Sequence, residues 1–175
     1  MTRSTATVVD LFAGAGGFST GATMAGCRVA WAANHWPTAV QWHTANHPET
    51  QHACQDLQQA NFLDAPRHDL LLASPACQGH SPARGKDKPH HDAQRATAWA
   101  VVTCAEVHRP PVVVVENVPS FASAWVLYPA WCAAMNALGY ALQPMVLDLA
   151  DSGVPQHRRR LFVVATRSRH PIELK

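Results

Sequence analysis

The chain has 175 residues, of which 47% are hydrophobic and 15% are charged, and its formal net charge is +2. This length suits a single domain spanning residues 1–175, which buries roughly 70% of its unfolded surface. The apolar fraction excludes global disorder, and the small net charge means that any nucleic-acid-binding surface must be local. No stretch approaches the about 20 apolar residues of a membrane span, and the N-terminus lacks a signal-peptide pattern. We therefore expect a cytoplasmic protein without membrane contacts.

The cysteine and histidine patterns argue against a metal site. The five cysteines are scattered, odd in number and contain no C-x-x-C pair, so neither a disulfide framework nor a structural zinc site is expected. None of the eleven histidines is expected to share one helix with another at the four-residue spacing of many metal ligands. The sequence predicts no bound metal and a reducing compartment.

Strand and helix patterns alternate along the chain. The first half predicts strands at 7–12, 28–33, 51–56 and 70–73, with helices at 17–25 and 37–46. The second half predicts a polar loop at 79–91, helices at 93–108 and 129–138, and strands at 112–115, 140–147 and 160–166. This alternation is typical of an α/β fold with a doubly wound, mostly parallel sheet. The turn through Gly153 and Pro155 leaves no room for a helix, so the last strand should be antiparallel.

A glycine-rich turn follows the first predicted strand. Gly14, Gly16 and Gly17 lie between that strand and the first helix, where backbone can approach a ligand closely. The spacing lacks the lysine of a phosphate-binding P-loop, so a nucleoside with a carboxylate tail fits as well as a phosphate. The alternative is a tight turn that needs glycines only for packing.

Cys77 lies in a loop-forming segment directly after the strand at 70–73. Its neighbours Ser74, Pro75, Gln78 and Gly79 are turn formers, which favours an accessible thiol at the ligand-binding edge of the sheet. Such a thiol could act as a nucleophile if its pKa were lowered. The alternative is a buried structural cysteine, the role that we assign to the other four.

Two further charged motifs lie at the ends of predicted strands. Glu116 follows the strand at 112–115, and the arginine motif opens the strand at 160–166. Glu116 follows a run of four valines, where partial desolvation would raise its pKa and let it donate a proton to a ring nitrogen. Asn117 is better suited to ordering the turn. Arg158 and Arg160 share one face of an extended chain and suit a phosphate or a base carbonyl. The alternatives are a capping or ion-pairing role for Glu116 and a solvated basic cluster for the arginines.

Together these motifs resemble the DNA (cytosine-5) methyltransferase family over residues 8–166, in the family's order. The matching segments are Asp10-Leu11-Phe12-Ala13-Gly14-x-Gly16-Gly17-Phe18, Pro75-Ala76-Cys77-Gln78 with Ser81, Glu116-Asn117-Val118, and Gln156-x-Arg158-x-Arg160. The resemblance implies a methyltransferase fold of Rossmann-like type. It also implies transfer of a methyl group from S-adenosylmethionine to carbon-5 of a cytosine flipped out of DNA.

The resemblance also implies roles for individual residues. Cys77 would attack carbon-6, Glu116 would bind the ring near N3, Arg160 would hold the O2 carbonyl, and Arg158 would support the loop. Phe12 would pack against the adenine of the cofactor and Asp56 would lie near its exocyclic amine. The implied cofactor-binding residues are Phe12, Ala13, Gly14, Gly16, Gly17, Asn34, His35, Asp56, Leu57 and Pro75. The implied DNA-binding residues are Gln78, Ser81, Arg84 and Asn117.

The chain departs from the family pattern at three positions. Ala76 replaces the proline before the nucleophile, Asn34 replaces an acidic residue for the cofactor ribose, and His80 replaces an aromatic or apolar residue. An amide binds a hydroxyl less strongly than a carboxylate does.

Family members continue beyond the Q-x-R-x-R motif into a target-recognition domain and a closing helix. We therefore expect a fragment or one subunit of a split restriction-modification enzyme of bacterial or phage origin. Its partners would be double-stranded DNA and a second subunit, and the isolated chain would show weak or no methyl transfer. The alternatives are a catalytically inactive cofactor-binding remnant and a tRNA cytosine-5 methyltransferase.

Overall fold

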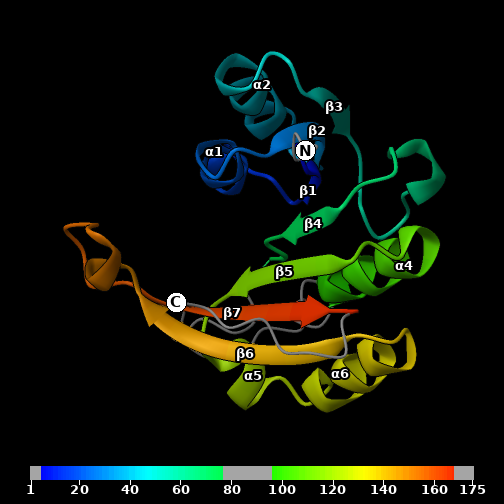
Figure 1. Ribbon diagram of the computed structural model, residues 1–175, viewed down its shortest axis with the longest axis vertical. Coiled ribbons are helices and arrows are strands. Elements are labelled where there is room, and N and C mark those ends of the chain that lie inside the picture. Colours follow the sequence, from blue (N-terminus) through cyan, green and yellow to red (C-terminus); the bar gives the residue numbers. More distant parts are fainter. Residues whose placement is uncertain (1–4, 77–95, 168–175) are drawn as a thin grey trace.

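The computed structural model describes residues 5–76 and 96–167, which form one seven-stranded sheet with its helices (Figure 1). The strands are β1 (Thr7–Leu11), β2 (Arg28–Asn34), β3 (Gln51–Cys54), β4 (Leu70–Ala73), β5 (Val112–Asn117), β6 (Ala141–Asp148) and β7 (Arg159–Thr166). The α-helices are α1 (Gly17–Met24), α2 (Pro37–Asn46), α4 (Trp99–His108), α5 (Ser120–Ala124) and α6 (Tyr128–Ala137). Short 3-10 turns are η1 (Phe62–Asp64), η3 (Ala96–Ala98) and η4 (Leu149–Ser152).

The sheet has the order β3-β2-β1-β4-β5-β7-β6. Strands β1 to β5 are parallel, whereas β7 pairs antiparallel with both β5 and β6. This confirms the predicted α/β class and the antiparallel last strand. Strand β7, the last strand of the described residues, lies between β5 and β6 and is therefore inside the sheet rather than at its edge.

Alternate residues of the central strands pack on opposite faces of the sheet. On one face, Val9, Leu71 and Val113 join a core with α4 and α6 residues. On the other face, Val8 and Leu72 pack with Ala22 of α1. Because both faces are covered, the parallel strands are rich in β-branched and leucine residues rather than alternating with polar ones.

Most element boundaries lie within two residues of the predictions, but three features differ. The helix predicted at 93–108 becomes an α-helix only at Trp99, after the 3-10 turn η3, and residues 93–95 lie outside the described part of the chain. The short helix α5 was not predicted, since its sequence Ser-Phe-Ala-Ser-Ala has no strong helical periodicity. Strand β5 continues through Glu116 and Asn117, because both residues pair with β7. Glu116 is therefore held in the sheet rather than in the loop after it.

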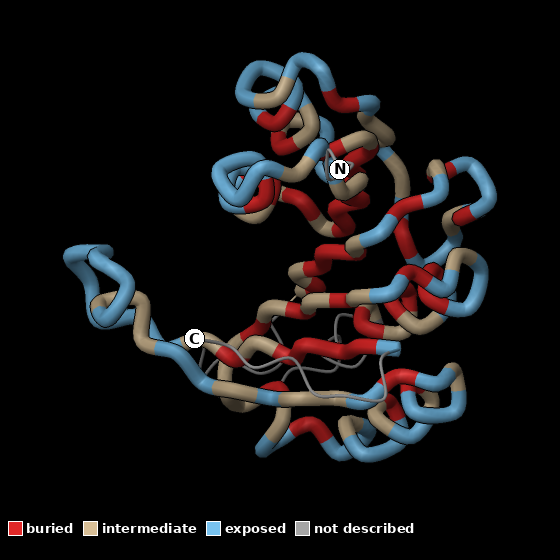
Figure 2. The backbone as a smooth tube through the Cα atoms, in the orientation of Figure 1, coloured by how far each residue is buried: buried red, intermediate tan, exposed pale blue. Residues whose placement is uncertain are grey.

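The connection between β6 and β7 extends away from the body of the protein as an arm, defined here as residues 149–158. Residues 151–158 are all exposed, as the pale blue tube in Figure 2 shows. No helix within residues 5–76 and 96–167 is long and apolar enough to cross a membrane.

The buried Trp131 provides a test of the core between α4, α6 and the sheet. Its side chain is 0% exposed, and its Nε1–H donates to the Ala98 carbonyl at 3.0 Å. Trp131→Phe should lower the free energy of unfolding by about 1–3 kcal/mol, because it leaves a cavity and an unsatisfied carbonyl. Urea denaturation measures this loss. Leu63→Ala, at a side chain that is 75% exposed, is the control, and an equal loss there would contradict this assignment of the core.

Candidate active site

Most of the predicted ligand-binding residues lie at one edge of the sheet. Residues at the carboxyl ends of β1, β2, β3 and β4 supply all the predicted cofactor contacts. They are Phe12, Ala13, Gly14, Gly16, Gly17, Asn34, His35, Asp56, Leu57 and Pro75. Because parallel strands end at the same edge, segments far apart in the sequence meet there.

The glycine turn has the backbone geometry that its sequence suggested. Gly14 and Gly16 have positive φ values of 57° and 100°, and Phe12 adopts an unusual left-handed φ of 59°. A non-glycine residue in this region stores backbone strain, which is common at ligand sites. The N-cap residue of α1 is Gly16, which has no side chain that could cap the helix. The turn therefore presents backbone rather than side chains to the edge of the sheet.

Trp36 was not among the predicted site residues. Its backbone N–H donates to Asn34 Oδ1 at 3.0 Å, which forms a turn directly after β2. The indole is 50% exposed and contacts Trp42 edge to face, with ring centroids 5.5 Å apart. Its position directly after a parallel strand was the available signal, because ligands bind beyond such strand ends.

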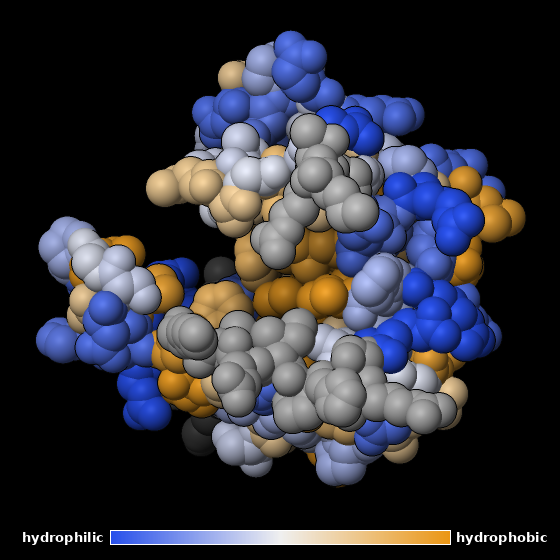
Figure 3. All heavy atoms as spheres, viewed as in Figure 1, coloured by the Kyte–Doolittle hydropathy of each residue, from blue (hydrophilic) through white to orange (hydrophobic). Residues whose placement is uncertain are grey.

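A cavity of about 410 Å³ lies between α1, β5, β7 and the arm. Its lining residues are Gly17, Phe18, Ser74, Glu116, Leu149, Arg158, Arg160 and Phe162. In Figure 3 the surface is hollowed between the arm and the N-terminal half, with hydrophobic atoms on its floor. The cavity thus joins the glycine turn to the predicted Glu116 and arginine cluster, and its size suits a small ligand.

Glu116 and Arg160 form an ion pair in this cavity. Arg160 Nε lies 3.0 Å from Glu116 Oε1, and the two side chains are only 18% and 26% exposed. The contact follows from strand pairing, because Glu116 lies opposite Phe162 and Arg160 is two residues away on the same face. Arg158 lines the same cavity, so the structure brings together the three predicted charged residues.

Burial raises the pKa of the Glu116 carboxyl above its ordinary value. Arg160, Arg158 and hydrogen bonds from Arg160 and Ser74 oppose this rise, but desolvation outweighs them. A carboxyl with a raised pKa can hold a proton closer to neutral pH and donate it to a ligand. Ser74, which the sequence did not single out, is therefore part of this site.

Asn117 points away from the cavity and is buried. Its Nδ2 donates to the Pro75 carbonyl at 3.1 Å, and its Oδ1 accepts the Val118 N–H at 2.9 Å. These bonds tie the segment after β4 to the end of β5. Both polar atoms of Asn117 are used within the protein, and its predicted DNA contact remains a prediction.

Four predicted residues lie outside the described part of the chain. They are Cys77, Gln78, Ser81 and Arg84. The preceding residues, Pro75 and Ala76, are described, and Pro75 is buried beside Asn117. The four free cysteines in the described part are Cys27, Cys54, Cys104 and Cys132. Burial raises the pKa of Cys104 to about 12, which agrees with its structural assignment.

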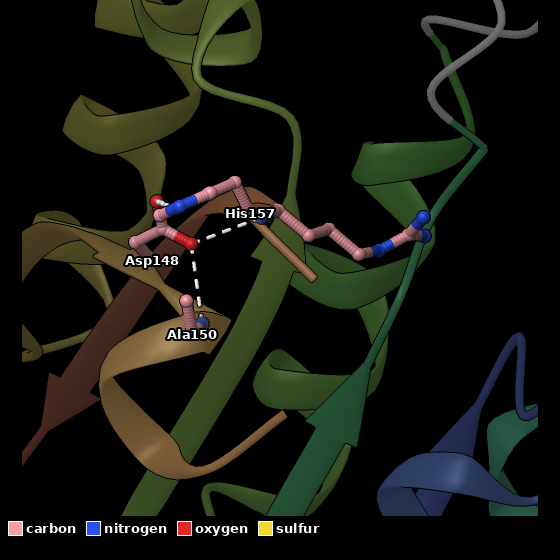
Figure 4. A network of polar contacts seen from close by, with 4 residues as sticks. Asp148, Ala150 and His157 are labelled. Atoms are coloured by element: carbon pink, nitrogen blue, oxygen red, sulfur yellow. Dashed lines mark hydrogen bonds and ion pairs between the residues drawn. The ribbon is translucent and has the colours of Figure 1, made fainter. Parts of the chain in front are cut away.

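Asp148 orders the base of the arm (Figure 4). Its Oδ1 accepts N–H groups of Ala150 at 3.2 Å and Arg158 at 2.9 Å, and its Oδ2 lies 3.2 Å from His157 Nδ1. These hydrogen bonds lower the pKa of the Asp148 carboxyl. A single carboxylate thus joins the two ends of the arm and holds the backbone from which Arg158 reaches the cavity.

Comparisons with known proteins match nearly the whole chain. The Type II methyltransferase M.HgiDI of Herpetosiphon aurantiacus is 31% identical over 163 residues, which cover 91% of this chain and 52% of that protein. The Type II methyltransferase M.HhaI of Haemophilus parahaemolyticus is 31% identical over 163 residues, covering 91% and 49%. A solved E. coli prophage protein, described as a DNA modification methyltransferase, superposes with a TM-score of 0.77. It is 26% identical and covers 93% of this chain and 47% of its own.

The α/β fold is that of a solved DNA modification methyltransferase, which defines the class as methyltransferases. Residues 6–175 match the C-5 cytosine-specific DNA methylases, and the chain belongs to that family. The chain spans about half the length of the curated relatives that it matches. No group of three or more metal-binding side chains is present within the described residues.

The raised pKa of Glu116 predicts a pH-dependent cost to stability. Because the folded state binds this proton more tightly than the unfolded state, stability falls as pH rises from the unfolded pKa through the folded pKa. The free energy of unfolding of Glu116→Gln, relative to that of the wild type, should therefore increase as pH rises from acid to neutral. Urea denaturation across that range measures the difference, with exposed Glu49→Gln as the control. A difference that is constant with pH would contradict the assignment.

Proposed function

We propose that this chain is the catalytic portion of a DNA cytosine-5 methyltransferase. The observation that carries the proposal is the shared cavity in which Gly17, Glu116 and Arg160 meet, in a member of the C-5 cytosine-specific DNA methylase family. The glycine turn would bind the methyl donor, and the carboxyl group beside the guanidiniums would bind the base that accepts the methyl group. The relatives M.HgiDI and M.HhaI are named Type II methyltransferases, which supports DNA as the substrate.

The edge residues fit S-adenosylmethionine, the cofactor that the family and fold imply. Apart from the adjoining residues, no atom of the described part of the chain lies within 4 Å of where a Cβ would stand on Gly14 or Gly17, so the turn has room for a ligand. Phe12 and the half-exposed Trp36 offer aromatic faces for adenine, and Asp56 offers a carboxylate for an exocyclic amine. When bound, this cofactor supplies a methyl group on a positively charged sulfonium.

The reaction begins with Cys77 acting on a cytosine that has been flipped out of the duplex. Its thiolate forms a bond to carbon-6, and the displaced electron pair moves into the ring, where Glu116 donates a proton or hydrogen bond near N3. Carbon-5 becomes nucleophilic and accepts the methyl group, and the sulfur of the donor would keep the electron pair of the broken S–C bond and leave as a neutral thioether. Loss of the carbon-5 proton and rupture of the bond to carbon-6 then return Cys77 as the free thiolate.

The two arginines have different roles in this proposal. Arg160, which already contacts Glu116, holds the O2 carbonyl of the base and keeps the carboxyl in place. Arg158 supports the loop and the DNA backbone from the arm that Asp148 orders. Asn117 positions the start of the Cys77 segment through the Pro75 carbonyl. Gln78, Ser81 and Arg84 contact the DNA, and Asn34 and His35 contact the ribose side of the cofactor.

We also propose that a second subunit supplies target recognition. Phosphate contacts position a protein on DNA, whereas sequence is read by side chains at base edges, a task distinct from the chemistry of the cavity that holds Glu116 and Arg160.

Cofactor binding is the first test of the proposal. Calorimetric titration of the folded chain with S-adenosylmethionine and S-adenosylhomocysteine should give micromolar binding of both. Gly14→Val should weaken binding strongly, because a β-branched side chain is strained at φ 57° and fills the open turn. Binding that is unaffected by this change would place the cofactor elsewhere.

Replacement of the proposed nucleophile tests the chemistry. Cys77→Ser should reduce methyl transfer to DNA cytosines on the order of a thousandfold or more, because a hydroxyl is a much poorer nucleophile than a thiolate. Transfer of a radiolabelled methyl group, measured with the partner subunit present, reports the loss. The same variant should still bind the cofactor, and Cys54→Ser, at an exposed free cysteine, should retain activity. Undiminished turnover by Cys77→Ser would remove Cys77 from the mechanism.

A further inference from the structure

The C-terminal turn of α2 holds the glycine turn by two direct hydrogen bonds. Asn46 Nδ2 donates to the Ala15 carbonyl at 2.8 Å, and His47 Nε2 lies 3.2 Å from the Gly16 carbonyl. A carbonyl only accepts, so His47 must carry its proton on Nε2. Thr20 Oγ1 of α1 donates to the same Gly16 carbonyl at 2.9 Å and lies 3.1 Å from His47 Nε2, so the Nε2 proton is shared between that hydroxyl oxygen and the carbonyl.

The His47 ring also packs directly on the turn. A Cβ built on Gly16 would lie 2.6 Å from His47 Cδ2, closer than real Cβ atoms approach, and 3.2 Å from His43 Cδ2, which is a tight contact. His43 and His47 are four residues apart, and their ring centroids are 4.7 Å apart. This histidine pair was not predicted from the sequence, because His47 is the C-cap of α2 and lies outside the helix predicted at 37–46.

Behind this contact lies a buried network of hydrogen-bonded side chains. Ser19 Oγ donates to Asp10 Oδ2 at 2.6 Å, and His43 Nε2 lies 3.1 Å from Ser19 Oγ. His52 Nε2 lies 2.8 Å from His43 Nδ1. Since the Ser19 proton is directed at Asp10, His43 donates from Nε2 and accepts at Nδ1 from His52. The hydrogen bonds of this network therefore all donate in one direction, from His52 on β3 to Asp10 on β1.

Burying this hydrogen-bond network costs desolvation free energy. Asp10 and Ser19 are 0% exposed and His43 is 1% exposed, and Asp10 Oδ1 has no hydrogen-bond partner among the described residues. Burial raises the pKa of Asp10 to about 7 and lowers that of His43 to about 4. Apolar residues of similar size would fill the same space without this desolvation cost. None of these groups lines the cavity that holds Glu116 and Arg160.

We propose that Asn46 and His47, supported by the buried network through His43, are positioning residues that hold the glycine turn in its cofactor-binding conformation. This inference rests on the proposed function for its ligand, but the positioning itself concerns the free protein. The two hydrogen bonds restrain Ala15 and Gly16, the residues between the strained Phe12 and the start of α1. A turn that is already ordered loses less conformational entropy when a ligand binds.

Matched variants separate hydrogen bonding from packing. Asn46→Asp keeps the side-chain shape but removes the donor, and His47→Leu keeps bulk without a donor. His47→Gln retains an N–H group that reaches the place of Nε2. Thr44→Val is the control on the same helix, because Thr44 is exposed and its hydroxyl donates to the Val40 carbonyl within α2.

Two readouts are measured on the whole chain. Amide hydrogen exchange of residues 13–17 reports the turn in the free protein, and calorimetry reports the Kd for S-adenosylhomocysteine. Asn46→Asp and His47→Leu should each accelerate exchange and raise Kd about five- to tenfold, as expected for the loss of one hydrogen bond. His47→Gln should stay within about twofold of the wild type, and Thr44→Val should not differ.

The outcomes distinguish this proposal from the proposed function. If the wild type does not bind the cofactor product but exchange responds as expected, the positioning role stands and the cofactor assignment fails. If the wild type binds and Asn46→Asp and His47→Leu match it in both readouts, the positioning role is overturned. Equal losses in His47→Gln and His47→Leu would also overturn it, since packing alone would then explain the effect.

Discussion

The register between β5 and β7 is the constraint on which the proposed catalytic site depends. Val113 and Val115 face one core with Val163 and Ala165, so Glu116 is turned to the opposite face beside Arg160. A slip of β5 by one residue would turn Glu116 into the apolar core and move Val115 to the opposite face of the sheet, where the cavity lies. The hydrophobic pairing therefore sets the position of the charged pair, and the ion pair itself contributes little to fixing it because it is partly exposed.

Two buried polar side chains connect this sheet to the loops at its edge. Asn117 holds the Pro75 carbonyl ahead of Cys77, and Asp10 lies under the glycine turn in contact with Ser19. Both are placed where a strand ends and a ligand-binding segment begins. Each costs desolvation that an apolar side chain would avoid, which is characteristic of sites where precise placement outweighs stability. The site is thus supported from within the sheet rather than by its exposed loops.

Much of the fold was predictable because its signals are local. The valine run at 112–115, the leucines at 70–73 and the Pro37 helix start each indicate one element, and the structure confirms them. Helix α5 was missed because its five residues carry no periodic pattern. The extension of β5 through Asn117 was missed because it depends on pairing with β7, which is distant in the sequence.

The sequence by itself determined the fold class, the order of the motifs and the family to which they belong, because glycine spacing, strand patterns and motif order are properties of contiguous residues. Only the tertiary structure decided which of these residues meet. The pairing of Glu116 with Arg160, the part played by Ser74 and the packing of His47 on Gly16 all join separate elements. Such contacts arise from sheet register and helix packing, which depend on the whole chain folding cooperatively rather than on any one segment.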